Sequence, residues 1–413
     1  MKPDVLIVGA GLAGLCCARK LHQQGVSFLI LEASDGVGGR IRTDLIEGFR
    51  VDRGFQVFLT SYPEAKQVLD YESLELRPFL PGALVRHGGA FNQLTDPWRR
   101  PLAALGSLFS PIGSFVDKLQ TARLRSHSLK GTSEERFRDP ETTTIEALKN
   151  AGFSASMIDR FFRPFLGGIF LDPELQTSSR MFHFVFRMFS LGSACLPTEG
   201  MEAIPRQLAA GLPSDSVRFG AKVVRVQPGL VMLESGEELR AGAVVLAVDG
   251  TGAAQLLGDV MPSAGQSVTC LYFVARRSPV EQPVLVLNGE GRGPVNNLCV
   301  PTVVAPSYGP SDESLVSVTV LGIPRDEELL QTEVRKQLRD WFGLAADDWR
   351  HLRTYRIPYA LPNQVPPALA VPERSVRRQS GLYVCGDHLD NASIQGAMVS
   401  GRRAAAAVWE DIS

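Results

Sequence analysis

The N-terminal strand–helix–strand pattern restricts the fold more than any other stretch of the chain. Val5–Val8 is an apolar run, Leu12–Gln24 is a helix-like segment, and Phe28–Leu31 is a second apolar run that ends at Glu32. Short continuous apolar runs joined by a crossover helix are typical of buried parallel strands. The sequence therefore predicts a Rossmann-type βαβ unit at the start of an α/β fold.

The turn between the first strand and the helix carries three glycines in the spacing G-x-G-x-x-G: Gly9, Gly11 and Gly14. The first glycine permits a tight turn, the second lets backbone approach a pyrophosphate, and the third lets the helix pack close to the strand. The helix N-terminus, at Leu12 and Ala13, offers N–H groups and a positive dipole end to phosphates. Glu32, with Ala33 beside it, is placed to accept hydrogen bonds from a ribose hydroxyl. We expect a dinucleotide at this edge.

A second glycine cluster follows Glu32 in the pattern E-x-x-x-x-x-G-G-R. Gly38 and Gly39 let backbone run beside a phosphate, and Arg40 adds a fixed charge with fork geometry. This arrangement resembles the flavin amine oxidase superfamily, which also holds protoporphyrinogen oxidases, phytoene desaturases and carotene isomerases. The resemblance implies FAD, held non-covalently, with its pyrophosphate and adenosine ribose at these positions.

The C-terminal stretch resembles the closing FAD motif of the same superfamily. An apolar run, Leu382–Cys385, ends at Gly386–Asp387, and a helix is expected from about Ile394 to Trp409. The resemblance places Asp387 at the ribitol–phosphate region. It also directs the N–H groups of the helix start at the flavin pyrimidine oxygen, which stabilises negative charge on the reduced ring. The implied contacts are Gly386, Asp387, Ser393, Ile394, Gln395 and Ala397.

Two further segments are implied as flavin contacts. The stretch around Asp52 matches a D-x-G pattern that passes beside the flavin ring in the superfamily, which makes Gly54, Phe55 and Gln56 candidates. A strand with a glycine bulge is the alternative interpretation. In the family, a backbone group in the first strand of a β-meander holds the adenine, and here that residue is expected to be Val223 or its neighbour Val224.

The candidate catalytic residues are Gln56, Tyr355 and Tyr359. The two tyrosines match a strand that lines the flavin-facing pocket in the family, and they would serve an amine as an aromatic cage through cation–π attraction. Amine oxidases of the superfamily usually place a Lys near the flavin, but the segment where we expect it, Gly291–Pro310, contains none. This departure favours the desaturase, protoporphyrinogen-oxidase-like and isomerase branches.

The length of 413 residues allows two sizeable cores. We expect a Rossmann-type FAD-binding domain assembled from discontinuous segments, and an α+β substrate-binding domain made from the remainder. The FAD-binding segments are 1–79, 197–266 and 372–413, and the substrate-binding segments are 80–196 and 267–371.

Two stretches of the substrate-binding part have two open interpretations each. A phenylalanine-rich run either forms helix core or lines a channel for an apolar substrate: Phe161, Phe162, Phe165, Phe182, Phe184, Phe186 and Phe189. The stretch 98–125 mixes apolar and basic residues at helical spacing. It is either a solvated arginine face or a peripheral contact with an anionic membrane. No apolar run reaches the roughly 18 uncharged residues that a spanning helix needs.

The composition limits the kinds of partner and cofactor that we expect this chain to bind. The net charge of −1 provides no basic field that would gather nucleic acid. The six cysteines include no C-x-x-C pair, and the six histidines show no metal-ligand spacing, so we expect a reducing, cytoplasmic location and no metal. Cys385 or His388 as a covalent flavin attachment is the alternative to a core cysteine and a surface-turn histidine.

Together these patterns predict an FAD-dependent oxidoreductase. It would remove a hydride from a C–H bond of a small or lipophilic substrate of the amine, isoprenoid or tetrapyrrole class, with oxygen or a quinone-like acceptor. Two alternatives stay open at this stage. One is a redox-neutral isomerase that uses reduced FAD, and the other is a non-enzymatic flavin-binding protein.

Overall fold

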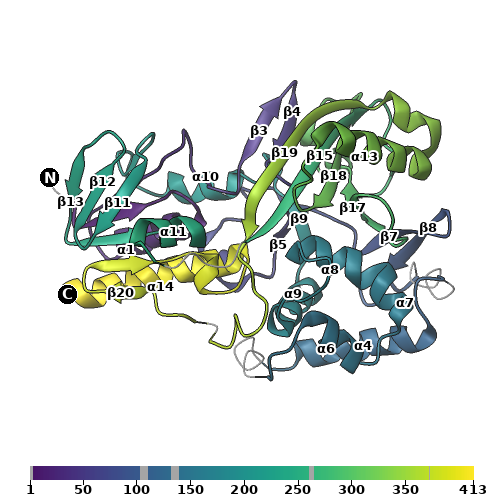
Figure 1. Cartoon of the computed structure of the whole chain (residues 1–413), viewed down its shortest axis with the longest axis horizontal. Coiled ribbons are helices and arrows are strands. Elements are labelled where there is room, and N and C mark those ends of the chain that lie inside the picture. Colours follow the sequence, from purple (N-terminus) through teal and green to yellow (C-terminus); the bar gives the residue numbers. More distant parts are fainter. Residues whose placement is uncertain (1–2, 103–109, 132–138, 260–264, 372) are drawn as a thin grey trace.

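Two sheets organise the chain. The computed structural model describes residues 3–102, 110–131, 139–259, 265–371 and 373–413. Figure 1 shows a parallel sheet with both chain termini at one end of the molecule, and a second sheet with a layer of helices at the other end. The expected α/β class with a discontinuous Rossmann-type sheet is confirmed.

The parallel sheet brings together strands from three separate parts of the chain. Its order is β10 (Val217–Arg218), β2 (Phe28–Leu31), β1 (Val5–Val8), β14 (Ala243–Leu246), β21 (Leu382–Val384) and β20 (Arg377–Gln379). All neighbours run parallel except β20 and β21. The expected strands at the two ends of the chain therefore lie in one sheet, and their carboxyl ends meet at one edge.

Alternate side chains of β1 enter two different cores. Val5 and Ile7 pack with the helices α1 and α14, whereas Leu6 and Val8 pack beneath the meander and α11. This alternation follows from the period of two in a strand, and burial on both faces explains the continuous apolar run. The covering elements are α1 (Leu12–Gln23), α10 (Ala203–Ala210), α14 (Ile394–Ile412), β11 (Val223–Gln227), β12 (Leu230–Leu233), β13 (Glu238–Arg240) and α11 (Gly250–Leu257).

The second sheet is mixed and has seven strands. Its order is β19 (Arg350–Leu361), β15 (Gln266–Ala275), β18 (Ser314–Leu321), β17 (Val295–Cys299), β16 (Leu285–Asn288), β7 (Gly82–His87) and β8 (Ala90–Thr95). One face packs on α13 (Glu327–Phe342), which buries Leu330, Val334 and Leu338 against it. The hairpin β7–β8 joins strands from 267–371, as the expected substrate-binding unit requires. The domain boundaries themselves stay a prediction.

Helices cover the other side of the mixed sheet: α4 (Phe115–Leu129), α6 (Thr144–Asn150), α7 (Ala155–Met157), the π-helical turn η1 (Ile158–Phe162), α8 (Arg163–Phe170) and α9 (Ser179–Leu191). Thr143 and Glu146 form a capping box at the start of α6. In the phenylalanine-rich run, Phe162, Phe182 and Phe184 are buried. The other four phenylalanines are partly buried and pack against the same core.

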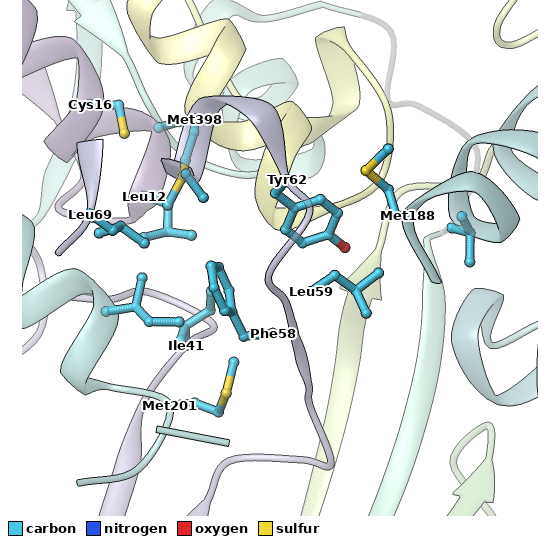
Figure 2. Packing of buried hydrophobic residues seen from close by; sticks show 14 of the residues in the cluster. Leu12, Cys16, Ile41, Phe58, Leu59, Tyr62, Leu69, Met188, Met201 and Met398 are labelled. Atoms are coloured by element: carbon cyan, nitrogen blue, oxygen red, sulfur yellow. The ribbon is translucent and has the colours of Figure 1, made fainter. Parts of the chain in front are cut away.

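Short elements connect the two sheets. They are β3 (Thr43–Ile46), β4 (Phe49–Asp52), β5 (Phe58–Leu59), α2 (Pro63–Val68), β6 (Arg77–Pro78), β9 (Ala194–Leu196), α12 (Pro301–Val304), η2 (Pro306–Tyr308), η3 (Gly343–Asp348) and η4 (Asp387–Leu389). Figure 2 shows the core that they help to form, where Phe58, Leu59 and Tyr62 lie between Met398 of α14 and Met188 of α9. The two units are thus packed together rather than joined by a loose linker.

Candidate functional site

The glycine-rich turn has the geometry of a phosphate cradle. A Cβ on Gly14 would lie 2.0 Å from the carbonyl oxygen of Gly9, so α1 rests directly on the end of β1. A Cβ on Gly11 would meet no heavy atom within 4 Å, so the backbone there faces open space. Gly11 is the N-cap of α1, no side chain caps that end, and the first turn holds no acidic residue. Leu12 and Ala13 therefore begin a helix whose positive end is open to an anion.

Glu32 stands at the end of β2 as a buried acceptor. Its Oε2 accepts from the Ala10 N–H at 2.7 Å, and its Oε1 accepts from the N–H and hydroxyl of Ser34 at 2.8 and 2.7 Å. An ionised carboxylate offers about four acceptor positions, so capacity remains for one more donor. The backbone of Glu32 also accepts from the Ala221 N–H at 2.8 Å, which brings the segment before Val223 beside this acid. Ala33 is exposed.

Arg40 contacts residues from both ends of the chain. Its Nη2 lies 2.7 Å from Oδ1 of Asp387, and its Nη1 donates to the carbonyl of Ala360 at 2.8 Å. Its own carbonyl accepts from the Gln56 side chain at 2.9 Å. Its guanidinium lies 5.8 Å from the centre of the Tyr359 ring. Four residues chosen from the sequence for cofactor binding or catalysis are therefore neighbours.

The backbone beside Arg40 approaches the first glycine turn. Gly39 has φ +59°, and a Cβ there would lie 3.4 Å from the Cα of Gly11. Gly38 has φ +117°, a conformation that favours glycine, and its N–H donates to the Ala10 carbonyl at 2.9 Å. The two glycine clusters thus lie against each other, as a shared pyrophosphate would require.

Two side chains at the start of α14 fix its position. Ser393 caps it by accepting from the Gly396 N–H at 3.1 Å. Gln395 accepts from the Glu64 N–H at 2.9 Å, which ties α14 to α2. The first turn, which holds Ile394 and Ala397, contains no acidic residue. The helix end is therefore oriented and carries no negative side chain.

The stretch Gly54–Gln56 lies between the two sheets. Gly54 has φ +91°, and a Cβ there would come within 2.7 Å of the Ile357 side chain on β19. The Phe55 ring meets Phe79 edge-on at 6.4 Å. A glycine is therefore needed for close approach at Gly54, and the two interpretations drawn from the sequence stay predictions.

The two candidate tyrosines do not come together. They are four positions apart on β19, or about 13 Å. The Tyr355 hydroxyl donates to Oδ2 of Asp44 at 2.5 Å, whereas Tyr359 lies beside Arg40 and Asp387. Burial raises the pKa of Tyr359 to about 12, with a further contribution from Asp387, so its phenol stays protonated. An aromatic cage formed by this pair has no support in their contacts, and the catalytic roles stay predictions.

Asp52 anchors a buried network whose members the sequence did not single out. Its Oδ1 accepts from the Thr43 hydroxyl at 2.5 Å and the Met201 N–H at 3.0 Å, and its Oδ2 accepts from the Tyr308 hydroxyl at 2.9 Å. Its backbone carbonyl accepts from the Tyr272 hydroxyl at 2.8 Å. Burial raises the pKa of Asp52 to about 6 despite these donors. The network ties the strand before Gly54 to β15 and η2.

Gln364 is a second positioning residue that sequence reasoning missed. Its buried side chain donates to the Asp390 carbonyl at 2.9 Å and accepts from the Ala392 N–H at 3.0 Å. Its backbone carbonyl accepts from the Ser178 N–H at 2.8 Å, at the start of α9. One residue therefore links the loop before α14 to the helical layer. No local pattern marks it, because all three partners are distant in sequence.

A cavity of about 530 Å³ lies beside the Arg40–Asp387 pair. Tyr359, His388, Arg374 and one face of α11 line it. Burial lowers the pKa of His388 and raises the pKa of the neighbouring Cys385 thiol, so the imidazole is held neutral and the thiol unreactive. Within the described ranges no group of three or more His, Cys, Asp or Glu side chains is placed to hold a metal ion.

The residues at this edge fit a dinucleotide. The open backbone at Gly11, the exposed Gly39, the Arg40 guanidinium and the spare acceptor capacity of Glu32 supply the donors and acceptors that a pyrophosphate and a ribose need. The start of α14 supplies a positive end further along the same edge.

Comparisons with known proteins identify the family. The family model for flavin containing amine oxidoreductases matches residues 12–409. The carotenoid phi-ring synthase of Streptomyces griseus is 26% identical over 346 residues, which cover 72% of this chain and 65% of that protein. The chain thus spans just under two thirds of this relative's length.

Solved structures share the fold over the whole chain. A putative protoporphyrinogen oxidase from Exiguobacterium sp. superposes with a TM-score of 0.72 at 18% identity, covering 99% of each chain. Cyclohexylamine oxidase from Brevibacterium oxydans superposes with a TM-score of 0.71 at 18% identity, covering 100% of each chain. Enzymes with different names superpose equally well, so the fold alone does not select a substrate.

Proposed function

We propose, from the premise that this chain belongs to the flavin-containing amine oxidoreductase family, that it is an FAD-dependent oxidoreductase acting on a C–H bond of a small or lipophilic substrate. The observation that carries this proposal is the junction at Arg40. There the Arg40 guanidinium, which follows the second glycine cluster, lies 2.7 Å from Asp387 of the C-terminal motif. One site is thus assembled from the two ends of the chain.

The binding roles follow from the chemistry of each side chain. Glu32 would hold the adenosine ribose, and the Val223 backbone would hold the adenine. Gly11, Gly39 and Arg40 would hold the pyrophosphate. Asp387 would accept from the ribityl chain, and the start of α14 would face the pyrimidine edge. Because the Cys385 thiol is buried and its pKa is raised, we infer that FAD is held without a covalent bond.

Bound FAD would supply the two-electron acceptor for a hydride, with oxygen or a quinone-like molecule accepting the electrons afterwards. The protein's own side chains would position the cofactor and the substrate and shield them from solvent. Gln56 fixes the Arg40 backbone. Tyr359 remains protonated and presents a hydroxyl at the end of β19. In the segment Gly54–Gln56, Gly54 is buried and Phe55 packs partly buried against the core.

The substrate class is narrowed by an absence in the sequence. The segment Gly291–Pro310 contains no Lys. An isoprenoid or tetrapyrrole therefore suits this chain better than an amine. The name of the Streptomyces griseus relative, carotenoid phi-ring synthase, supports a lipophilic substrate.

A redox-neutral isomerase that needs reduced FAD is the second candidate, and the missing Lys favours it equally. Anaerobic assays with lipophilic polyenes separate the two. The oxidoreductase turns over only when an acceptor is added, whereas the isomerase converts substrate with reduced FAD and no net acceptor. A non-enzymatic flavin-binding protein would do neither, and its cellular activity would survive replacement of Tyr359 and Gln56.

The location is proposed from cysteine use. All six cysteines are buried free thiols, which supports a reducing compartment such as the cytoplasm. No helix in the described part of the chain is long and apolar enough to cross a membrane. The stretch 98–125 remains the candidate for peripheral contact with a membrane surface.

A further inference from the structure

The outer face of α4 exposes large apolar side chains at its first turns. Phe115 is 78% exposed, Val116 is 55% exposed and Leu119 is 47% exposed. Residues one turn apart stand on the same side of a helix, so these three form one patch, which we call the docking face. Figure 1 shows α4 at the rim of the helical layer, away from the parallel sheet. The docking face therefore packs on none of the described cores.

The segment before α4 also exposes large apolar side chains. Leu102 is 84% exposed, and Trp98 is 46% exposed with its ring 4.9 Å from the Arg125 guanidinium on α4. The sequence from Pro101 to Val116 contains no charged residue. The structure describes residues 101–102 and 110–116 of this stretch, in which Leu102, Phe115 and Val116 are exposed and Ile112 is buried. Exposed apolar side chains that gather in one patch, as on the docking face, mark an interaction site.

Basic residues flank the docking face in the sequence. Residues 98–130 contain six basic side chains and one acidic one, a net charge of +5, whereas the whole chain carries −1. The basic residues are Arg99, Arg100, Lys118, Arg123, Arg125 and Lys130. The single acid, Asp117, is buried in the cap of α4, where it accepts from Ser114 and Ser154. Asp96 lies 3.8 Å from Arg99 and 3.9 Å from Arg125, so these two charges are paired, whereas Arg123 on α4 and Lys130 at its C-terminal end are exposed.

We infer that the docking face binds the surface of an anionic phospholipid bilayer, with Phe115, Val116 and Leu119 entering the acyl boundary and the flanking basic residues facing the headgroups. Aromatic and aliphatic tips bordered by Arg and Lys suit this interface. Like charges would oppose pairing of two copies through this face. The inference deepens the proposed function and rests on it in one respect, because a lipophilic substrate resides in the bilayer.

The test uses the FAD-loaded full chain and sedimentation with large vesicles. Vesicles of phosphatidylcholine alone are compared with vesicles that also contain phosphatidylglycerol. We expect binding to the mixed vesicles, and a loss of about tenfold or more for Phe115→Ser/Leu119→Ser, because two apolar side chains leave the interface. Arg123→Gln/Lys130→Gln should weaken binding to the mixed vesicles alone.

Leu344→Ser is the matched control, because Leu344 is 70% exposed on η3, far along the chain from α4. It should bind vesicles as the parent does. Equal binding by Phe115→Ser/Leu119→Ser, or binding by no form of the protein, overturns the inference. So does a dimer in light scattering that this double variant abolishes. FAD content and circular dichroism confirm that each variant is folded. Vesicle binding needs no turnover, so a failed activity assay leaves this result independent of the proposed function.

Discussion

Replacing Asp52 by Asn should remove one pH-dependent part of the folding free energy. Asp52 is buried, and its pKa rises from an ordinary 3.8 to about 6 because burial disfavours the charged carboxylate. The Asn amide oxygen can still accept from the Met201 N–H and the Thr43 hydroxyl. The amide nitrogen would face the Tyr308 hydroxyl, which can accept as well as donate. The substitution thus keeps the network and removes only the titration.

The direction of the pH dependence follows from whether the folded or the unfolded state binds the Asp52 proton. Between about pH 4 and pH 6 the folded protein keeps the Asp52 proton while the unfolded chain has lost it, so rising pH favours unfolding. A pKa raised from 3.8 to about 6 corresponds to about 3 kcal/mol. This stabilisation is complete below about pH 4 and is lost as the pH rises through about 6. Relative to Asp52→Asn, the parent should therefore lose about 3 kcal/mol between pH 4 and pH 7.

Urea unfolding of both proteins across this pH range, with FAD in constant excess, measures the difference. Other carboxylates titrate in both proteins and cancel. Asp326→Asn is the control, because Asp326 caps α13 and Asn caps a helix equally well. Its difference from the parent should stay small at every pH. A difference between the parent and Asp52→Asn that is also flat with pH would refute the assignment of a raised pKa to this buried network.

Three substitutions test the cradle. Gly14→Ala brings a Cβ to 2.0 Å from the Gly9 carbonyl, so it should lower the melting temperature and the FAD content instead of giving the usual gain of about 1 kcal/mol for Gly to Ala in a helix. Gly11→Ala meets nothing within 4 Å, so the apoprotein should melt as the parent does while FAD affinity falls about tenfold or more in a fluorescence titration. Arg40→Gln removes the charge paired with Asp387 and should likewise weaken FAD binding about tenfold, whereas unchanged affinity would remove Arg40 from the site.

The fold could be predicted from the sequence where the interactions that determine it are local. The apolar run Val5–Val8 indicates a strand that is buried on both faces, and its side chains enter two cores. The spacing of Gly14 indicates close packing of the helix on the strand, and a Cβ there would strike Gly9. The cap of α6 follows from Thr143 and Glu146, three residues apart. Each of these signals lies within one element or one turn of chain.

The positioning residues could not be predicted from the sequence, because their hydrogen-bond partners are distant along the chain. Tyr308 reaches Asp52 from 256 residues away, and the Gln364 carbonyl accepts from Ser178 at the start of α9. Nothing in the residues around either one differs from an ordinary loop. The different neighbours of Tyr355 and Tyr359 were also hidden, because the sequence indicates which side chains share a strand but not which groups each one meets.

The central claim is that the two ends of the chain form one FAD site around Arg40. The most direct measurement is a titration of the purified apoprotein with FAD, followed by flavin fluorescence and the visible absorption spectrum. The account predicts saturation at about one FAD per chain, with the flavin spectrum retained after gel filtration. A chain that carries no flavin when purified and takes up none in this titration would contradict it.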